Sequence, residues 1–331
     1  MRRREFIALI GGAAATWPRG VRAQSKDSTR HIGMLMNNVA TDQLYQSYVD
    51  VLVKTLQTLG WREGQNLRVD VRWTEGKPDL IHSYAMELVA TAPDLIVASS
   101  TANLKAVLPA TRSIPIVFLL VSDPVVQGFI SNLARPGGNM TGFSAYEFSM
   151  GAKWLDLLKQ MAPSLTRIGV MFNPDTSPQS QLFLRSIEAA APGFGVQAIA
   201  APIHDSTEIA RAIGDIGREP NGGLLFPTDN FTGVHNDEIV ELAARYRLPA
   251  IYSNSEVAAR KGGLMYYGID YVPQFRQAAV YVDRILKGAR PGDLPVQMAT
   301  DFKLIINLKT AHALGLEIPM GLMMRANEII E

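Results

Sequence analysis

The chain of 331 residues contains no cysteine. This absence excludes a disulfide framework, a thiolate metal site, an iron–sulfur cluster and a cysteine nucleophile. Charge is also scarce and balanced, because only 19% of the residues are charged and 32 Lys and Arg stand against 31 Asp and Glu. Such a balance excludes a polycationic nucleic-acid binder and a highly charged disordered chain. We therefore expect no nucleic-acid partner.

Motifs for catalysis and metal binding are missing as well. No two of the five histidines stand three or four residues apart, which is the spacing that places a metal pair on one helix face. There is no phosphate-binding glycine loop, and the stretch 142–146 begins like a nucleophile elbow but lacks its final glycine. We predict that the protein is not an enzyme and holds neither a metal nor a cofactor.

The first residues are typical of an export signal. Three arginines at 2–4 precede an apolar stretch at 6–15, which is too short to span a bilayer, since that takes about 20 residues. Residues 21–23 fit a signal-peptidase cleavage site, and residues 3–7 resemble the core of a twin-arginine signal. We predict a cleaved signal peptide over 1–23 and a periplasmic protein, exported by the twin-arginine or the general secretory route.

Removal of that leader changes the net charge. It takes away five arginines and one glutamate, so that 27 basic and 30 acidic residues remain, with a net charge of −3. This charge gives no reason to expect an anionic surface partner. Because no cysteine is available for lipidation, we also expect no membrane anchor, and we expect a monomer.

From residue 30 onward, short β-rich runs alternate with helical stretches that have one apolar face. The nearly continuous apolar runs at 94–98 and 114–121 are typical of strands buried on both faces, as in a parallel sheet covered by helices. The alternating run at 67–73 predicts a strand near a sheet edge. We expect further strands at 31–36, 167–172, 196–200, 223–226, 250–252 and 263–267, and helices at 151–161, 177–191, 205–217, 234–246 and 273–287.

The βα order recurs in two blocks, which predicts an α/β fold with two doubly wound parallel-sheet lobes; a (β/α)8 barrel is the alternative. The segment 132–149 interrupts the alternation of strands and helices and contains three glycines, which is typical of a hinge. A three-crossing hinge near 142–146, 267–271 and 297–302 is the most economical connection. We expect lobe 1 over 30–142 plus 270–296, lobe 2 over 146–266 plus 302–318, and hinge residues Thr141, Gly142, Phe143 and Gly268.

Small polar residues follow almost every predicted strand. In open α/β sheets a ligand binds at the carboxyl ends of the strands. Helix capping accounts for any one of these residues, but their presence in both blocks indicates a small-molecule site between the lobes. The set is Asn37, Asn38, Ser99, Ser100, Thr101, Ser122 and Asp123 in the first block, and Asn173, Thr228, Asp229, Asn230, Ser253 and Asn254 in the second.

Within this set, the stretch 99–101 gives the clearest indication of a binding site. It follows a buried strand and opens a helix, so that free N–H groups and hydroxyls can receive an anion such as a carboxylate. Asp229 can receive an ammonium group, with Asp123 as the alternative. Tyrosines can supply an apolar wall, although Tyr48 lies on the periodic face of its helix and is expected in the core. The tyrosines considered for this wall are Tyr45, Tyr48, Tyr252, Tyr266 and Tyr267.

Several longer stretches carry a family resemblance. Residues 59–66 read LGWREGQN, residues 72–76 read RWTEG, and residues 133–142 read LARPGGNMTG. These stretches resemble the signature of ABC transporter substrate-binding proteins of the TrpX type. The resemblance continues in register over essentially the whole chain, through DLIVA at 94–98, IPIVF at 114–118, SDPV at 122–125, NP at 173–174, GGLM at 262–265 and YGID at 267–270.

This resemblance implies a type I periplasmic binding fold that closes around a small solute and hands it to an ABC permease and its ATPase. Family members that resemble the chain include binders of aromatic amino acids, which agrees with carboxylate and ammonium sites. The chain departs from the family pattern at Tyr266, where relatives often have Ser, and at Ser122, where Gly is usual. A periplasmic sensor subunit for a receptor kinase and an exported enzyme remain the alternative functions.

Overall fold

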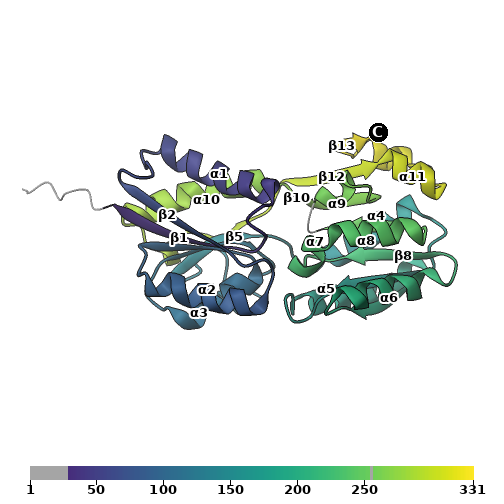
Figure 1. Ribbon diagram of the computed structural model, residues 1–331, viewed down its shortest axis with the longest axis horizontal. Helices are drawn as coiled ribbons and strands as arrows, with labels where there is room; N and C mark the ends of the chain where they lie inside the picture. Colours follow the sequence, from purple (N-terminus) through teal and green to yellow (C-terminus); the bar gives the residue numbers. More distant parts are fainter. Residues whose placement is uncertain (1–28, 254–255) are drawn as a thin grey trace, which may run out of the picture.

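The computed structural model describes residues 29–253 and 256–331. It has two β-sheets, each flanked by helices, which form two lobes side by side (Figure 1). Two separate sheets exclude the single barrel that the unit count also allowed. The predicted signal peptide at 1–23 and the predicted site residue Asn254 lie outside the described residues.

The first sheet is parallel throughout, with strand order β11-β5-β4-β3-β1-β2. Strand β3 is buried along its whole length, whereas β2 at the edge is half exposed, as its alternating sequence predicted. Helices α1 (Gln43–Thr58) and α10 (Tyr271–Leu286) pack together on one face, and α2 (Pro78–Ala90) and α3 (Thr101–Ala110) on the other (Figure 1). The strands are β1 (Arg30–Met36), β2 (Leu67–Trp73), β3 (Leu95–Ser99), β4 (Ile116–Val121), β5 (Met140–Ser144) and β11 (Gln297–Met298).

The second sheet has the order β13-β12-β10-β9-β8-β6-β7. Its strands are β6 (Arg167–Phe172), β7 (Gln197–Pro202), β8 (Gly222–Phe226), β9 (Ala250–Tyr252), β10 (Met265–Ile269), β12 (Phe302–Asn307) and β13 (Glu328–Ile330). Its helices are α4 (Met150–Met161), α5 (Ser180–Ala190), α6 (Ser206–Gly217), α7 (Asn230–Val234), α8 (Asn236–Arg245), α9 (Glu256–Arg260), α11 (Leu308–Leu314) and α12 (Met320–Met323). Short 3-10 turns are η1 (Ala191–Phe194) and, beside the first sheet, η2 (Pro291–Asp293).

Two features of the second sheet differ from the expectation. Strand β12 runs antiparallel to β10, because the chain enters it directly from the other lobe instead of through a covering helix. The sheet also gains a last strand, β13, which pairs with β12 beyond the expected end of the lobe at residue 318.

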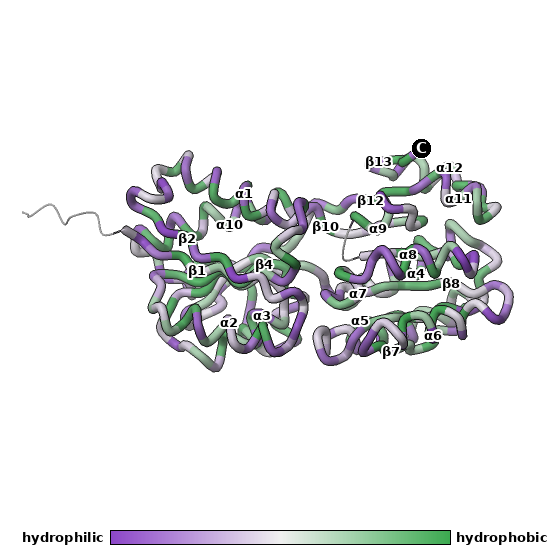
Figure 2. Tube along the Cα trace, in the orientation of Figure 1, coloured by the Kyte–Doolittle hydropathy of each residue, from purple (hydrophilic) through white to green (hydrophobic). Residues whose placement is uncertain are grey.

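One hydrophobic core runs through both lobes. It joins Tyr48 and Phe275, which stack between α1 and α10, to Trp154 and Phe183 of the second lobe, with Tyr146 in between. Tyr48 therefore belongs to the core, as its place on the periodic helix face predicted. Figure 2 shows hydrophobic residues along central strands such as β4 and alternating colours along outer helices such as α1. None of the helices in the described ranges has the length and apolar character needed to cross a membrane.

The described chain passes between the two sheets three times. The connections are residues 145–149 between β5 and α4, residue 270 between β10 and α10, and residues 299–301 between β11 and β12. Hydrogen bonds tie them together: the Ser144 carbonyl accepts from Gln274 Nε2 at 3.0 Å and from the Ala299 amide at 3.2 Å. The three connections are therefore bonded to one another at the edge of the first sheet.

The predicted hinge residues lie inside strands and not in these connections. Thr141, Gly142 and Phe143 belong to β5, and Gly268 belongs to β10. Gly142 is needed for packing, because a Cβ there would lie 2.1 Å from the Phe118 carbonyl oxygen of β4. Gly142 thus reflects a close approach of neighbouring strands, and the chain leaves the first sheet only after Ser144.

The buried Tyr146 hydroxyl links two of the connections, since it donates to the Ser253 carbonyl and accepts from the Ile269 amide, both at 2.9 Å. Burial holds its pKa well above the usual value, so the hydroxyl keeps its proton. Replacement of Tyr146 by Phe leaves two buried backbone groups unpaired and is expected to lower the free energy of unfolding by about 1–2 kcal/mol. Urea unfolding checks this value, with the exposed Tyr246→Phe as control. Equal midpoints for the two variants would contradict the expected role.

Candidate ligand-binding site

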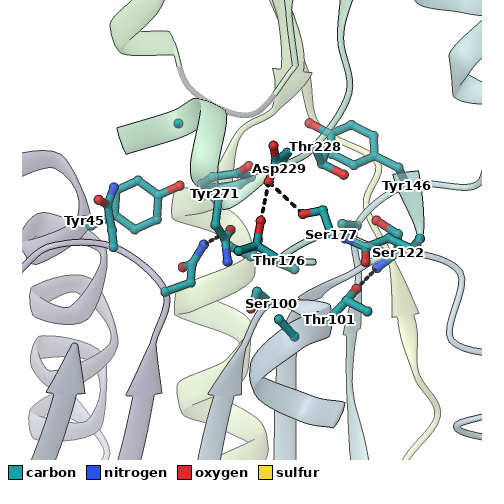
Figure 3. Close-up of a pocket in the computed structure, with 18 residues that line it drawn as sticks. Tyr45, Ser100, Thr101, Ser122, Tyr146, Thr176, Ser177, Thr228, Asp229 and Tyr271 are labelled. Atoms are coloured by element: carbon teal, nitrogen blue, oxygen red, sulfur yellow. Dashed lines mark hydrogen bonds between the residues drawn. The ribbon is translucent and has the colours of Figure 1, made fainter. Parts of the chain in front are cut away.

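A pocket lies between the lobes, where the strands of the first sheet end (Figure 3). The centre of a water-sized sphere can occupy about 50 Å³ in it, and the empty space between its walls, including the part open to solvent, is about 630 Å³. Both lobes and the connections contribute to its walls, and the lining residues are Asn37, Asn38, Tyr45, Ser100, Thr101, Ala102, Leu120, Ser122, Ala145, Tyr146, Thr176, Ser177, Gln179, Thr228, Asp229, Asn230, Gly233 and Tyr271. No lysine or arginine is among these lining residues.

On the first lobe, the N-terminus of α3 faces the pocket. Strand β3 ends at Ser99, and Ser100 caps the helix because its hydroxyl oxygen accepts the Asn103 amide at 3.3 Å. The Thr101 hydroxyl oxygen accepts the Ser122 amide, also at 3.3 Å. The first N–H groups of a helix lack partners within that helix and carry partial positive charge. This corner of the pocket suits an anionic group.

The backbone around this corner is strained. Ser100 has φ 98° and ψ 157°, a region that is populated almost only by glycine. Leu120, which also lines the pocket, has φ 56° at an irregularity in the pairing of β4 with β5. Strained residues persist where the surrounding structure fixes them, and they gather at functional sites.

On the second lobe, the buried carboxylate of Asp229 organises the wall. It caps α7 and accepts hydrogen bonds from the amides of Asn173, Phe231 and Thr232 and from two hydroxyls. Those hydroxyls belong to Thr176 and Ser177, and each lies 3.0 Å from Oδ1 (Figure 3). Burial raises the pKa of the Asp229 carboxyl above its ordinary value, and the hydrogen bonds oppose this rise.

Tyrosines supply the aromatic part of the pocket. Tyr45 of α1 and Tyr271 of α10 face each other edge-on, with ring centroids 6.5 Å apart (Figure 3). Burial raises the pKa of Tyr45 well above the usual value, so its hydroxyl is neutral. Tyr146 lines the pocket from the connection between the lobes. An aromatic or aliphatic side chain of a ligand fits against such rings.

The lobes contact each other directly at one edge of the pocket. Asn37 Nδ2 on the first lobe donates to Asn230 Oδ1 on the second lobe at 2.6 Å. Beside this bond, a Cβ on Gly76 of the first lobe would lie only 3.3 Å from the Cβ of Asn230. The two lobes are therefore in direct contact beside the pocket in this structure.

Most of the predicted strand-end residues meet in this one pocket. From the first lobe it includes Asn37, Asn38, Ser100, Thr101 and Ser122, and from the second lobe it includes Thr228, Asp229 and Asn230. The side chain of Asn38 bonds within its own loop, to Asp42 and to the Val39 amide. The structure also assigns the capping of α7 to Asp229, so this carboxylate has a structural task besides any contact with a ligand.

Besides the core residue Tyr48, seven predicted site residues of the described ranges do not line the pocket. Two of them use their hydroxyls on backbone carbonyls, since Ser253 donates to Phe226 and Tyr266 donates to Ile269. The Ser99 hydroxyl donates to Asn37 Oδ1 behind the wall, and the Asp123 carboxylate accepts the Val126 amide in its own turn. The Asn173 side chain shapes the loop after β6 by accepting the amides of residues 175 and 176. Tyr252 stacks on Phe226 in the core, and Tyr267 stacks on Phe302 near the connections. In each case a partner within the protein holds the side chain away from the pocket.

Five lining residues with polar side chains escaped the sequence analysis: Tyr146, Thr176, Ser177, Gln179 and Tyr271. Tyr146 lies in the connection that follows β5, and Tyr271 is the first residue of the helix that follows β10. A search that went beyond the first residues after each strand could have found both. The other three lie in the loop after β6, and Asp229 draws two of them to the pocket. In the described part of the chain, no cluster of three or more His, Asp or Glu could hold a metal ion.

Several solved structures share this architecture. A conserved domain protein from Vibrio cholerae has a TM-score of 0.83 and 28% identity over 91% of this chain and 100% of its own. A Streptococcus pneumonia ABC domain in complex with L-Trp has a TM-score of 0.79, with 24% identity over 92% and 100%. A ligand-free, open substrate binding protein with adhesive properties from Clostridium difficile has a TM-score of 0.65, with 27% identity over 91% and 99%.

Two α/β lobes with a polar pocket between them define a solute-binding protein of the type I periplasmic binding fold. The chain belongs to the ABC transporter substrate binding protein family, which matches residues 35–330. Among curated relatives, a tyrosine-binding protein of Clostridioides difficile is 29% identical over 286 residues, which are 86% of this chain and 80% of the relative.

Proposed function

We propose that this protein is the periplasmic solute-binding component of an ABC importer and that it captures an aromatic amino acid between its lobes. The observation that carries the proposal is one pocket with the free N-terminus of α3 on the first lobe and the Asp229 carboxylate on the second. The name of the tyrosine-binding relative supports the same ligand class. After closure the loaded protein would dock on its permease, whose ATPase drives import.

The two charged ends of an amino acid would bind opposite lobes. The carboxylate fits the N-terminus of α3, where helix N–H groups and the hydroxyls of Ser100 and Thr101 meet. The ammonium group fits the second lobe, near the negative charge of Asp229. The aromatic side chain would pack against the rings of Tyr45 and Tyr271 on the pocket wall. A ligand that needs contacts from both lobes binds the closed form better and so shifts the population toward it.

Two observations support closure as the mechanism. The bond between Asn37 and Asn230 requires contact between the lobes and cannot form when they separate. The structure also has a higher TM-score to the L-Trp complex (0.79) than to the open, ligand-free protein (0.65). The sequence identity is lower with the complex, so identity does not explain the difference. The lobes here therefore stand more like those of a ligand-bound relative.

Titration calorimetry against the twenty amino acids tests the ligand class, and small-angle scattering tests closure. We expect heat with at least one of L-tyrosine, L-tryptophan and L-phenylalanine, because the pocket combines zwitterion contacts with tyrosine rings. The radius of gyration is expected to be smaller with that amino acid than without it. Absence of heat with all twenty would overturn the amino-acid proposal. An unchanged radius on saturation would overturn closure by the ligand.

A further inference from the structure

The hydroxyls on the second-lobe wall are turned into hydrogen-bond acceptors. Thr176 and Ser177 each donate to Asp229 Oδ1 at 3.0 Å. A hydroxyl has a single hydrogen and two lone pairs. Since the hydrogen of each group is used on the carboxylate, only lone pairs remain for the pocket. Asp229 thus fixes two neutral side chains as acceptors.

The hydroxyls on the first-lobe wall have the opposite polarity. Ser100 Oγ accepts the Asn103 amide and Thr101 Oγ1 accepts the Ser122 amide. A backbone amide is always the donor, so these two hydroxyls keep their hydrogens for the pocket. Together with the N–H groups of α3 they form a donor wall. The pocket therefore has donors on one lobe and acceptors on the other.

Gln179 adds an acceptor that the protein leaves unused. It precedes α5, lines the pocket and is 8% exposed. Its side-chain oxygen Oε1 is buried and has no hydrogen-bond partner among the described residues. The hydroxyl oxygen of Thr228, another lining residue, is in the same state. Buried polar atoms are nearly always paired, so an unpaired oxygen of a residue that lines the same pocket as Thr176 and Ser177 indicates a place for a donor from a ligand.

We infer that Gln179 is a specificity-determining residue whose side-chain carbonyl accepts a hydrogen bond from the ammonium group of a bound amino acid. This inference rests on the proposed function and deepens it. Asp229 acts at this site through Thr176 and Ser177, which line the same pocket as Gln179 and, like its Oε1, can serve there as a group of acceptors. An ammonium group has three hydrogens, which such a cluster can receive without a direct ion pair. Amino acids would then be preferred over carboxylic acids that lack an amine.

The replacements Gln179→Met and Gln179→Glu test this role by titration calorimetry. The probe is whichever of L-tyrosine, L-tryptophan and L-phenylalanine binds the unsubstituted protein most tightly. Met keeps the length of the side chain and removes the acceptor, so its Kd is expected to rise about 10- to 100-fold, the range for a hydrogen bond to a charged group. Glu keeps acceptor oxygens, and its Kd is expected to stay within about threefold of the unsubstituted value.

Gln57→Met, the same change on the exposed face of α1, is the matched control and is expected to bind normally. A Gln179→Met variant with unchanged Kd would overturn the inference. Equal weakening by Met and Glu would also overturn it, because the effect would then come from packing. If the unsubstituted protein binds none of the three amino acids, the result overturns the proposed binding of an aromatic amino acid, and the inference on Gln179 is overturned with it. Thermal melting of each variant shows whether the fold is intact.

Discussion

Replacement of Asp229 by alanine is expected to lower the free energy of unfolding by about 3–5 kcal/mol and to abolish measurable binding of amino acids. The carboxylate is 3% exposed and joins two loops of the second lobe. It accepts amides from both of them, at Asn173 after β6 and at Phe231 in α7, together with the hydroxyls of Thr176 and Ser177. Alanine leaves all of these donors buried without this acceptor.

The magnitude follows from the cost of such donors. A buried polar group that loses its partner costs about 1–3 kcal/mol, and loss of a helix cap costs about 0.5–2 kcal/mol. The terms do not add fully, because water can enter the space that the carboxylate leaves. Binding is lost as well, since Thr176 and Ser177 no longer have a fixed hydrogen direction and the negative charge is gone.

Urea unfolding followed by circular dichroism measures this change. Asp229→Asn keeps one acceptor oxygen in the same place, so we expect it to cost clearly less than alanine. Asp237→Ala is a matched control on the solvent-facing side of α8, where the side chain is 72% exposed, and it is expected to change stability by no more than about 0.5 kcal/mol. A loss for Asp229→Ala as small as that of the control would contradict the account.

Much of the fold could be predicted because a parallel strand that is buried on both faces has a nearly continuous run of apolar residues. Strands β3 and β4 appear where nearly continuous apolar runs predicted them, and β2 is the predicted edge strand. Strand β5 was missed, because its sequence MTGFS has neither an apolar run nor an alternation. Its burial comes from pairing with β4, and the approach of Phe118 to Gly142 is a tertiary contact that no local pattern encodes.

The site could be predicted only where it follows strands directly. Ser100, Thr101 and Ser122 stand within two residues of a strand end, and the rule of strand ends finds them. Thr176 and Gln179 come into the pocket through a loop whose shape depends on a carboxylate more than 50 residues away. The spacing of residues along the sequence does not reveal such a long-range contact.

The predicted tyrosine wall failed in part for a related reason. Tyr252 stands at the end of β9, but its ring stacks on Phe226 with centroids 5.0 Å apart and an angle of 3° between planes. Strand pairing of β8 with β9 places these two rings side by side on one face of the sheet. Which face a terminal strand residue takes depends on this register, and the sequence of a three-residue strand does not specify it.

Replacement of Ser100 by glycine is expected to stabilise the protein by about 1 kcal/mol and yet to weaken binding of its amino acid about 10- to 100-fold. With φ 98° and ψ 157°, Ser100 adopts a conformation that costs a residue with a side chain about 1–3 kcal/mol. Glycine adopts it freely, and as a helix cap it is only a few tenths of a kcal/mol worse than serine. Part of the gain is offset because glycine makes the unfolded chain more flexible.

Binding should move in the opposite direction, because the hydroxyl that we propose to donate to the ligand's carboxylate is lost. Urea unfolding and titration calorimetry on the same preparation measure both quantities. Ser100→Ala separates the two effects: it loses the hydroxyl as glycine does but keeps the strained backbone, so it should bind as weakly and be less stable than the unsubstituted protein. A glycine variant that is destabilised, or that binds normally, would contradict this account. The expected pair of results would mean that the fold retains a strained serine at the end of β3 because the ligand site, and not stability, requires its hydroxyl there.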